Sequence, residues 1–178
     1  GEIVKDIFIP SILITLKPKL FNMQSEKYHI KINNNENIIT SQNIKRKIND
    51  FMIPNIKGLI IRTLPNNKEK KEFNYSDNSY PFFTNNAIKF LNKIGIKHLF
   101  VDTPSIDRFN DDGILGNHRL FWSEEGGQLN KTSKKTITEL CYINNEIKDG
   151  FYFINLQLPH FKLDAAPSRP ILIEADKI

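Results

Sequence analysis

Cysteine is almost absent from this sequence. Cys141 is the single cysteine among 178 residues, which excludes a disulfide bond within the chain. No apolar run approaches the ~18 residues that a membrane-spanning helix needs, and the opening residues Gly1-Glu2-Ile3-Val4-Lys5-Asp6 do not have the pattern of a signal peptide. We therefore expect a protein of the reducing cytoplasm that makes no membrane contact.

Acidic residues are outnumbered by basic ones, which gives a formal net charge of +5. A clustered positive charge would attract the phosphates of a nucleic acid. Here the basic residues are mostly scattered, and only Lys45-Arg46-Lys47 and Lys68-Glu69-Lys70-Lys71 are dense. The second run carries its own acid, as a solvated loop does. We expect no nucleic-acid partner, and the alternative of binding through Lys45-Arg46-Lys47 predicts a salt-sensitive affinity.

Internal repeats, low-complexity tails and obvious linkers are also missing, so residues 1–178 are expected to form one domain. Hydrophobic residues at 39% and charged residues at 25% fall near the range of ordinary globular proteins. Apolar periodicity then predicts the elements. The expected strands are residues 11–16, 28–32, 57–64, 97–102, 136–143, 151–158 and 170–174, and the expected helices are residues 42–51 and 84–93.

Three local signals support these elements. Thr40-Ser41 offers an N-cap for the first helix, and Gly95 is placed to end the second in a left-handed conformation. Asp149-Gly150 predicts a turn between the strands at 136–143 and 151–158. The strand, helix and strand that run from residue 57 to 102 form a crossover unit, which requires parallel strands. The fold class is therefore α/β, with a mixed, largely β sheet and two short covering helices.

The candidate chemistry lies after the strand at 97–102. An apolar run breaks there into Asp102-Thr103-Pro104-Ser105-Ile106-Asp107, and it is followed by a lone His118 and by Glu139. A neutral imidazole and a carboxylate can share a divalent metal ion. The structural alternative makes His118 an ordinary loop residue and Glu139 an exposed strand residue.

The two aspartates of this stretch, Asp102 and Asp107, also have two interpretations. They could support metal ligands from behind, or they could bond nearby backbone groups in an Asx turn. We favour the turn. Further along the chain, Asp164 with Ser168 and Arg169 could orient a substrate or form a buried structural pair, and the sequence leaves both open.

The order of these pieces resembles the cyclase family of metal-dependent hydrolases, which includes the bacterial kynurenine formamidases. The resemblance implies a cyclase-like swivelling β/β/α domain, incomplete at its N-terminus, and it assigns His118 and Glu139 as metal ligands for zinc or manganese. It also implies a small-molecule substrate and a homo-oligomer. The segments that carry the resemblance are Gly58–Thr63, Gly95–Asp107, the pair His118 and Glu139, and Phe151–Leu158 with Asp164–Pro170.

The family's signature run, His-x-Gly-Thr-His-x-Asp, has no counterpart in this sequence, and Glu2 stands where related proteins carry a histidine. By resemblance, the expected reaction is hydrolysis of an aryl formamide, such as N-formylkynurenine to kynurenine and formate. The rival expectation is a catalytically inactive fragment, or a diverged paralogue that keeps the fold without a complete metal site. The remaining histidines, His29, His98 and His160, are expected to be structural.

Overall fold

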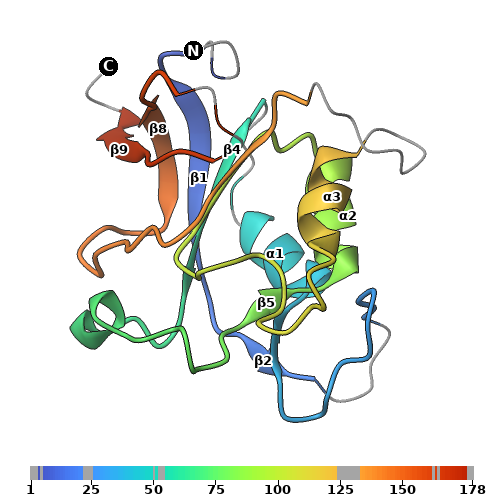
Figure 1. Cartoon of the computed structure of the whole chain (residues 1–178). Helices are drawn as coiled ribbons and strands as arrows, with labels where there is room; N and C mark the ends of the chain where they lie inside the picture. The colour runs from blue at the N-terminus through green and yellow to red at the C-terminus, as the bar shows by residue number, and fades with distance from the viewer. Residues whose placement is uncertain are drawn as a thin grey trace.

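Six strands form the main sheet of this protein, in the order β7-β6-β4-β1-β8-β9 (Figure 1). The computed structural model describes residues 4, 6–21, 26–49, 51, 55–123, 133–161, 163 and 165–175. The strands are β1 (Ile9–Leu16), β4 (Gly58–Thr63), β6 (His98–Val101), β7 (Thr136–Thr138), β8 (Gly150–Gln157) and β9 (Arg169–Glu174).

The sheet has a parallel half and an antiparallel half. β1, β4, β6 and β7 pair in parallel, whereas β8 pairs antiparallel with both β1 and β9. All six residues of β4 are buried, as expected of a central parallel strand with both faces covered. Gly58 opens this strand because any side chain there would collide with Ser11, whose Oγ lies 2.1 Å from the position of a Cβ.

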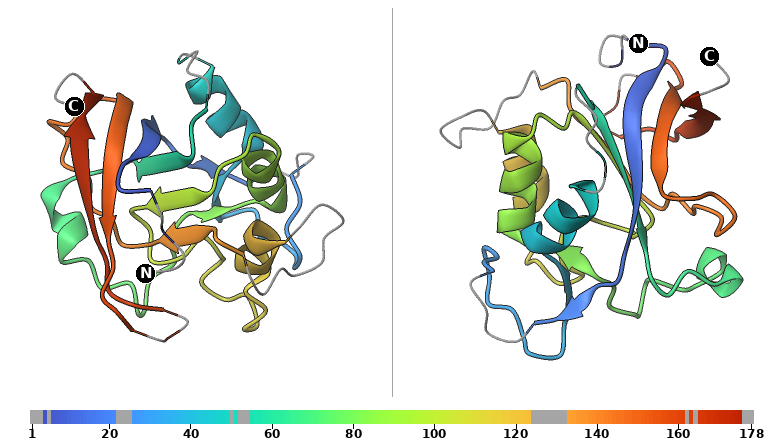
Figure 2. Two further views of the ribbon diagram at one scale, coloured as in Figure 1. Left: turned by 90° about the horizontal axis from the view of Figure 1, so that it is seen from above. Right: turned by 180° about the vertical axis from the view of Figure 1, so that it is seen from behind.

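Three helices cover one face of the sheet (Figure 2). α1 (Ser41–Ile48) and α2 (Asn85–Lys93) start as predicted, because the hydroxyls of Thr40 and Thr84 accept hydrogen bonds from backbone N–H groups in the first turn. Gly95 follows α2 with φ of 82°. The helices and the sheet share an apolar core that includes Ile12, Leu59, Leu99, Ile88 and Phe121.

The opposite face of the sheet carries a second apolar cluster. Its members alternate with those of the first, as strand geometry requires, so Leu13, Ile60 and Phe100 point away from the helices. Ile154 of β8 joins them. A 3-stranded sheet of β2 (Lys19–Leu20), β3 (Asn37–Ile39) and β5 (Phe82–Phe83) and the 3-10 helix η1 (Lys68–Lys71) complete the elements.

Three sequence predictions about elements were wrong. Residues 28–32 are not a strand; their alternation reflects contacts of Tyr28 and Ile32 with Phe82, and the nearby strand is β3. The strand expected at 136–143 ends at Thr138, since Leu140 adopts a left-handed φ of 57°. A third helix, α3 (Gly116–Trp122), occupies a stretch predicted to be a loop.

The turn at Asp149-Gly150 was also misassigned, because β8 pairs with β1 and not with β7. The Asp149 carboxylate instead accepts hydrogen bonds from the backbone N–H and the hydroxyl of Thr15, and it forms an ion pair with Arg62. These contacts fix the start of β8 to the parallel half of the sheet. The predicted fold class, a mixed and largely β sheet with short helices, is confirmed. Among the described residues, no helix has the length and apolar character to cross a bilayer.

Candidate metal centre

The parallel strands β4 and β6 end side by side. Asp102, the residue after β6, links the two strand ends. Its carboxylate accepts hydrogen bonds from the backbone N–H of Thr63 at 2.7 Å and from the Thr63 hydroxyl at 2.8 Å. Lys70 of η1 completes a buried ion pair with Asp102 at 2.7 Å. These contacts use Asp102 to fix strand ends and the loop that carries η1, so this aspartate has a structural role.

Asp107 lies beyond that strand end and determines where α3 begins. Leu115, the residue before α3, supplies no capping side chain. The buried Asp107 carboxylate takes over this task from ten residues away, because it accepts the backbone N–H groups of Asn117 at 2.7 Å and His118 at 3.2 Å. This long-range cap explains why a helix forms here although no local start signal is present in the sequence.

His118 lies between two carboxylates. Its Nδ1 is 2.7 Å from Asp107 Oδ2, and its Nε2 is 3.4 Å from Glu139 Oε1. Since a carboxylate only accepts, Nδ1 carries the proton toward Asp107. Glu139 follows the end of β7, and its Oε1 accepts the backbone N–H of Ile106 at 2.9 Å. Two predicted residues, 21 positions apart in sequence, are therefore adjacent in the fold.

The charges of this group depend on one another. Burial lowers the pKa of His118, but the hydrogen bonds with Asp107 and Glu139 outweigh it and raise that pKa to about 9. Burial would raise the pKa of Asp107, whereas the hydrogen bonds from His118 and Asn117 hold it below its usual value. In the metal-free protein at neutral pH, the imidazole is thus a cation flanked by carboxylates.

This arrangement fits a metal ligand. A metal-binding histidine ordinarily donates its second ring N–H to a carboxylate, which sets the tautomer and leaves the other nitrogen for the ion. Asp107 holds His118 in that way, and Nε2 faces a carboxylate oxygen of Glu139. His118 Nε2 and the Glu139 carboxylate could therefore both donate to one divalent ion.

Glu139 also borders a cleft of about 790 Å³ on the sheet face away from the helices. Cys141, Ser168 and Arg169 line the same cleft. Burial raises the pKa of the Cys141 thiol to about 12, so it is no nucleophile at neutral pH. The cleft gives a small molecule space next to Glu139, although His118 is not among its lining residues. Asp164, the third member of the predicted substrate group, lies outside the described residues, as does Glu2.

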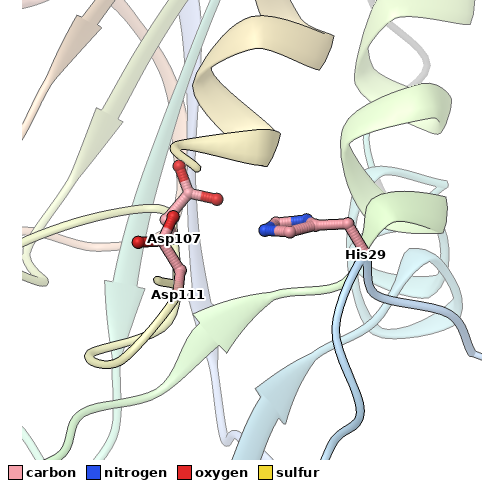
Figure 3. A group of neighbouring side chains, drawn as sticks. All are labelled: His29, Asp107 and Asp111. Carbon is pink, nitrogen blue, oxygen red and sulfur yellow. The ribbon is translucent and has the colours of Figure 1, made fainter. Parts of the chain in front are cut away.

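A second group, His29, Asp107 and Asp111, has ligand atoms within 4.8 Å of one another, and the His29 ring points toward both carboxylates (Figure 3). Both carboxylates already have donors. Asp111 accepts the backbone N–H groups of Gly113 at 3.0 Å and Leu115 at 2.6 Å, and Asp107 accepts four hydrogen bonds in all. These hydrogen bonds hold the loop before α3 in place. The spacing of the three side chains would also admit a cation.

The structure separates the predicted roles of the two aspartates. Asp107 has the supporting position behind His118 that we ranked below an Asx turn, and Asp102 has an ion pair that the sequence did not indicate. His98 is structural, with Nδ1 2.9 Å from the Thr136 hydroxyl. The contact of Tyr28 with Asp107 was not predicted, because the alternating residues 28–32 were interpreted as a strand.

Comparison with known proteins identifies the family. The model of the Cyclase family, described as "Putative cyclase", matches residues 2–108, which is more than half of the 178-residue chain. This chain belongs to the cyclase family. The match ends before His118 and Glu139, so it does not itself include the two candidate ligands.

Similar proteins agree with this assignment. A kynurenine formamidase of Bacillus cytotoxicus is 25% identical over 128 residues, covering 71% of this chain and 54% of that protein. The structure of a predicted metal-dependent hydrolase from Bacillus stearothermophilus superposes with a TM-score of 0.58 at 18% identity, over 94% of this chain and 64% of that one. A potential metal-dependent hydrolase with cyclase activity gives 0.56 at 19% identity, over 94% and 66%. The chain therefore spans about half the length of the formamidase.

Proposed function

We propose that this chain carries part of a metal-dependent amide hydrolase site, in which His118 and Glu139 bind one divalent ion, zinc or manganese. The observation that supports it is the His118 side chain, whose Nδ1 is tied to Asp107 while Nε2 faces Glu139 at 3.4 Å. The remaining donors are expected from elsewhere in the functional protein, since zinc sites use three or four protein ligands.

The proposed substrate is an aryl formamide such as N-formylkynurenine, which water would split into kynurenine and formate. A bound divalent ion would polarise the formyl carbonyl and activate the attacking water. The protein's own residues hold the ion's ligands in place and offer the cleft beside Glu139 for the substrate. Asp107 keeps the His118 ring oriented throughout. We further propose that the protein works as a homo-oligomer in the cytoplasm and that residues 1–178 form one domain.

The alternative is a family member that has kept the fold and lost catalysis. It is supported by Glu2, which stands where related sequences have a histidine. Such a protein would keep the contacts around His118 for stability alone.

Metal titration separates the two functions. Titrating the purified chain with zinc and with manganese by calorimetry should show a site that His118→Ala weakens by about 100-fold or more, beyond the ~10–100-fold typical of residues behind a ligand. Glu139→Gln should weaken it in the same direction. The control is His160→Ala, which removes an exposed histidine and should leave the affinity unchanged.

Two results would overturn the proposal. If His118→Ala and His160→Ala bind either metal as the unmodified chain does, the proposed ligands are wrong. If metal binding depends on His118 but no aryl formamide yields formate, the inactive alternative is preferred.

A further inference from the structure

The segment from Lys27 to Ile32 packs against the start of α3 and reaches Asp107 from the side opposite His118. The Tyr28 hydroxyl donates to Asp107 Oδ1 at 3.0 Å and accepts the backbone N–H of Arg108 at 2.9 Å. It thereby fixes both the carboxylate and the backbone just after it. The described hydrogen bonds of the Tyr28 hydroxyl end on Asp107 and Arg108 and not on Glu139, so the direct route from this hydroxyl to the His118 ring runs through Asp107.

Asp107 has four donors, and each of its oxygens is used twice. Oδ1 accepts from Tyr28 and from the backbone of Asn117, and Oδ2 accepts from the backbone and the ring of His118. Asp107 is 1% exposed, so water does not replace a lost donor. Without the Tyr28 hydroxyl, Oδ1 keeps only the Asn117 N–H, and the carboxylate settles at a different angle that moves Oδ2 relative to His118 Nδ1.

Tyr28 is itself held in place by aromatic contacts. Its ring packs edge-on against Phe82, with centroids 5.0 Å apart, and at a tilt of 38° against His29, with centroids 3.8 Å apart. The His29 ring in turn lies over Gly116, where a Cβ would come within 2.2 Å of His29 Cε1. Burial raises the pKa of Tyr28, so its phenol stays protonated and keeps donating. A side chain at position 116 would displace this aromatic pair from Asp107.

We propose that Tyr28 is a positioning residue for His118 and acts through Asp107. The chain of contacts runs from the Tyr28 hydroxyl through the Asp107 carboxylate to His118 Nδ1, with distances of 3.0 Å and 2.7 Å. This inference rests on the proposed function only in taking His118 as a metal ligand. The hydrogen bonds from Tyr28 to Asp107 and from Asp107 to His118 are present in the metal-free protein.

The test is an NMR measurement on the metal-free, ¹⁵N-labelled full chain. A ring N–H that is hydrogen-bonded to a carboxylate gives a separate downfield proton signal, and the His118 signal is assigned by its loss in His118→Gln. Tyr28→Phe keeps the ring contacts and removes the hydroxyl, and it should shift this signal. Tyr152→Phe is the matched control, because the hydroxyl of Tyr152 in β8 also donates a hydrogen bond, to the exposed carbonyl of Lys148. That control should leave the signal unmoved.

A second variant and a second readout guard against a simple folding defect. Gly116→Ala displaces His29 and should shift the same signal while Tyr28 is still present. In a zinc titration, Tyr28→Phe should weaken binding by about 3- to 10-fold, less than the ~10–100-fold that direct partners of ligating histidines give.

The outcomes separate this inference from the proposed function. If the His118 signal has the same position in Tyr28→Phe and Tyr152→Phe, Tyr28 is not a positioning residue, even if Tyr28→Phe lowers the melting temperature. If zinc binding does not depend on His118, the proposed metal function fails, and the NMR comparison still decides whether Tyr28 orients the ring.

Discussion

His98 lies at the amino end of β6 and His118 lies beyond its carboxyl end, and both imidazoles are largely shielded from solvent. At the amino end, burial lowers the pKa of His98 to about 4, since its Nδ1 partner is the neutral Thr136 hydroxyl. At the carboxyl end, Asp107 and Glu139 overcome burial and raise the pKa of His118 to about 9. The partners, and not the degree of burial, decide which histidine carries charge.

The same contrast extends beyond the two histidines. Asp102, Asp107 and Glu139 all follow the carboxyl ends of the parallel strands β6 and β7, where the connecting segments diverge and leave room for polar side chains. The charged pair described near the amino ends, Lys57 with Asp6, is solvent-exposed. Among the described residues, the carboxyl end is thus where buried charged side chains gather, and it is where we propose that a metal binds.

The largest effect is expected from Asp107→Ala, which removes the α3 cap and leaves the His118 cation with one carboxylate fewer. Breaking a buried pair in this way costs roughly 3–5 kcal/mol of unfolding free energy, and the measurement is urea denaturation followed by circular dichroism. Asp6→Ala, at the exposed pair of the amino end, is the control. Equal urea midpoints for the two variants would mean that the buried pair at the carboxyl end stabilises the fold no more than the exposed pair at the amino end.

A smaller effect is expected from Thr136→Val at the amino end. The change deprives His98 Nδ1 of its partner, and an unsatisfied buried group of this kind costs about 1–3 kcal/mol. Thr138→Val, two residues along the same strand, controls for the replacement itself. If urea denaturation shows no loss for Thr136→Val relative to this control, then His98 has another partner or is not held neutral by its surroundings.

The smallest effect on the unfolding free energy is expected when the pH of the metal-free protein is changed by one unit. His98 stays neutral in the fold down to about pH 4, while the unfolded chain takes up that proton near pH 6.5, so stability falls as the pH drops through this interval. His118 stays protonated up to about pH 9, so its contribution is complete below about pH 6.5 and disappears as the pH rises to about 9.

Each group changes the unfolding free energy by at most about 1.4 kcal/mol per pH unit. Thermal or urea unfolding across pH 4–10 in the presence of a chelator should therefore lose its acid slope in His98→Gln and its alkaline slope in His118→Gln. The opposite assignment, or slopes that neither variant alters, would mean that the two histidines do not differ as described.

The two helices with local start signals were predicted correctly. α1 and α2 have threonine N-caps, and Gly95 ends α2, so these boundaries follow from neighbouring residues, whereas α1 ends at Ile48 and not at the predicted residue 51. α3 has no such signal, because its cap is supplied by Asp107 from a distant loop. The strand predicted at 28–32 failed for the related reason that its side chains contact Phe82 of β5 and Asp107, while its backbone forms no strand.

The candidate site was reached by a different route. The order of His118 and Glu139 was informative only through resemblance to a family, since 21 intervening residues define no local motif. The adjacency of the two side chains depends on β7 pairing with β6 and on Asp107 anchoring α3, both of which are long-range contacts. Tyr28 could not be predicted at all, because its hydroxyl contacts a residue 79 positions away.

The central claim is that a divalent ion binds between His118 and Glu139. Crystals of the chain grown with manganese or zinc, with diffraction recorded at the absorption edge of the metal, would locate any bound ion by its anomalous scattering. The account predicts a peak within bonding distance of His118 Nε2 and a Glu139 carboxylate oxygen. A peak instead among His29, Asp107 and Asp111, or no peak beside His118 at saturating metal, would contradict it.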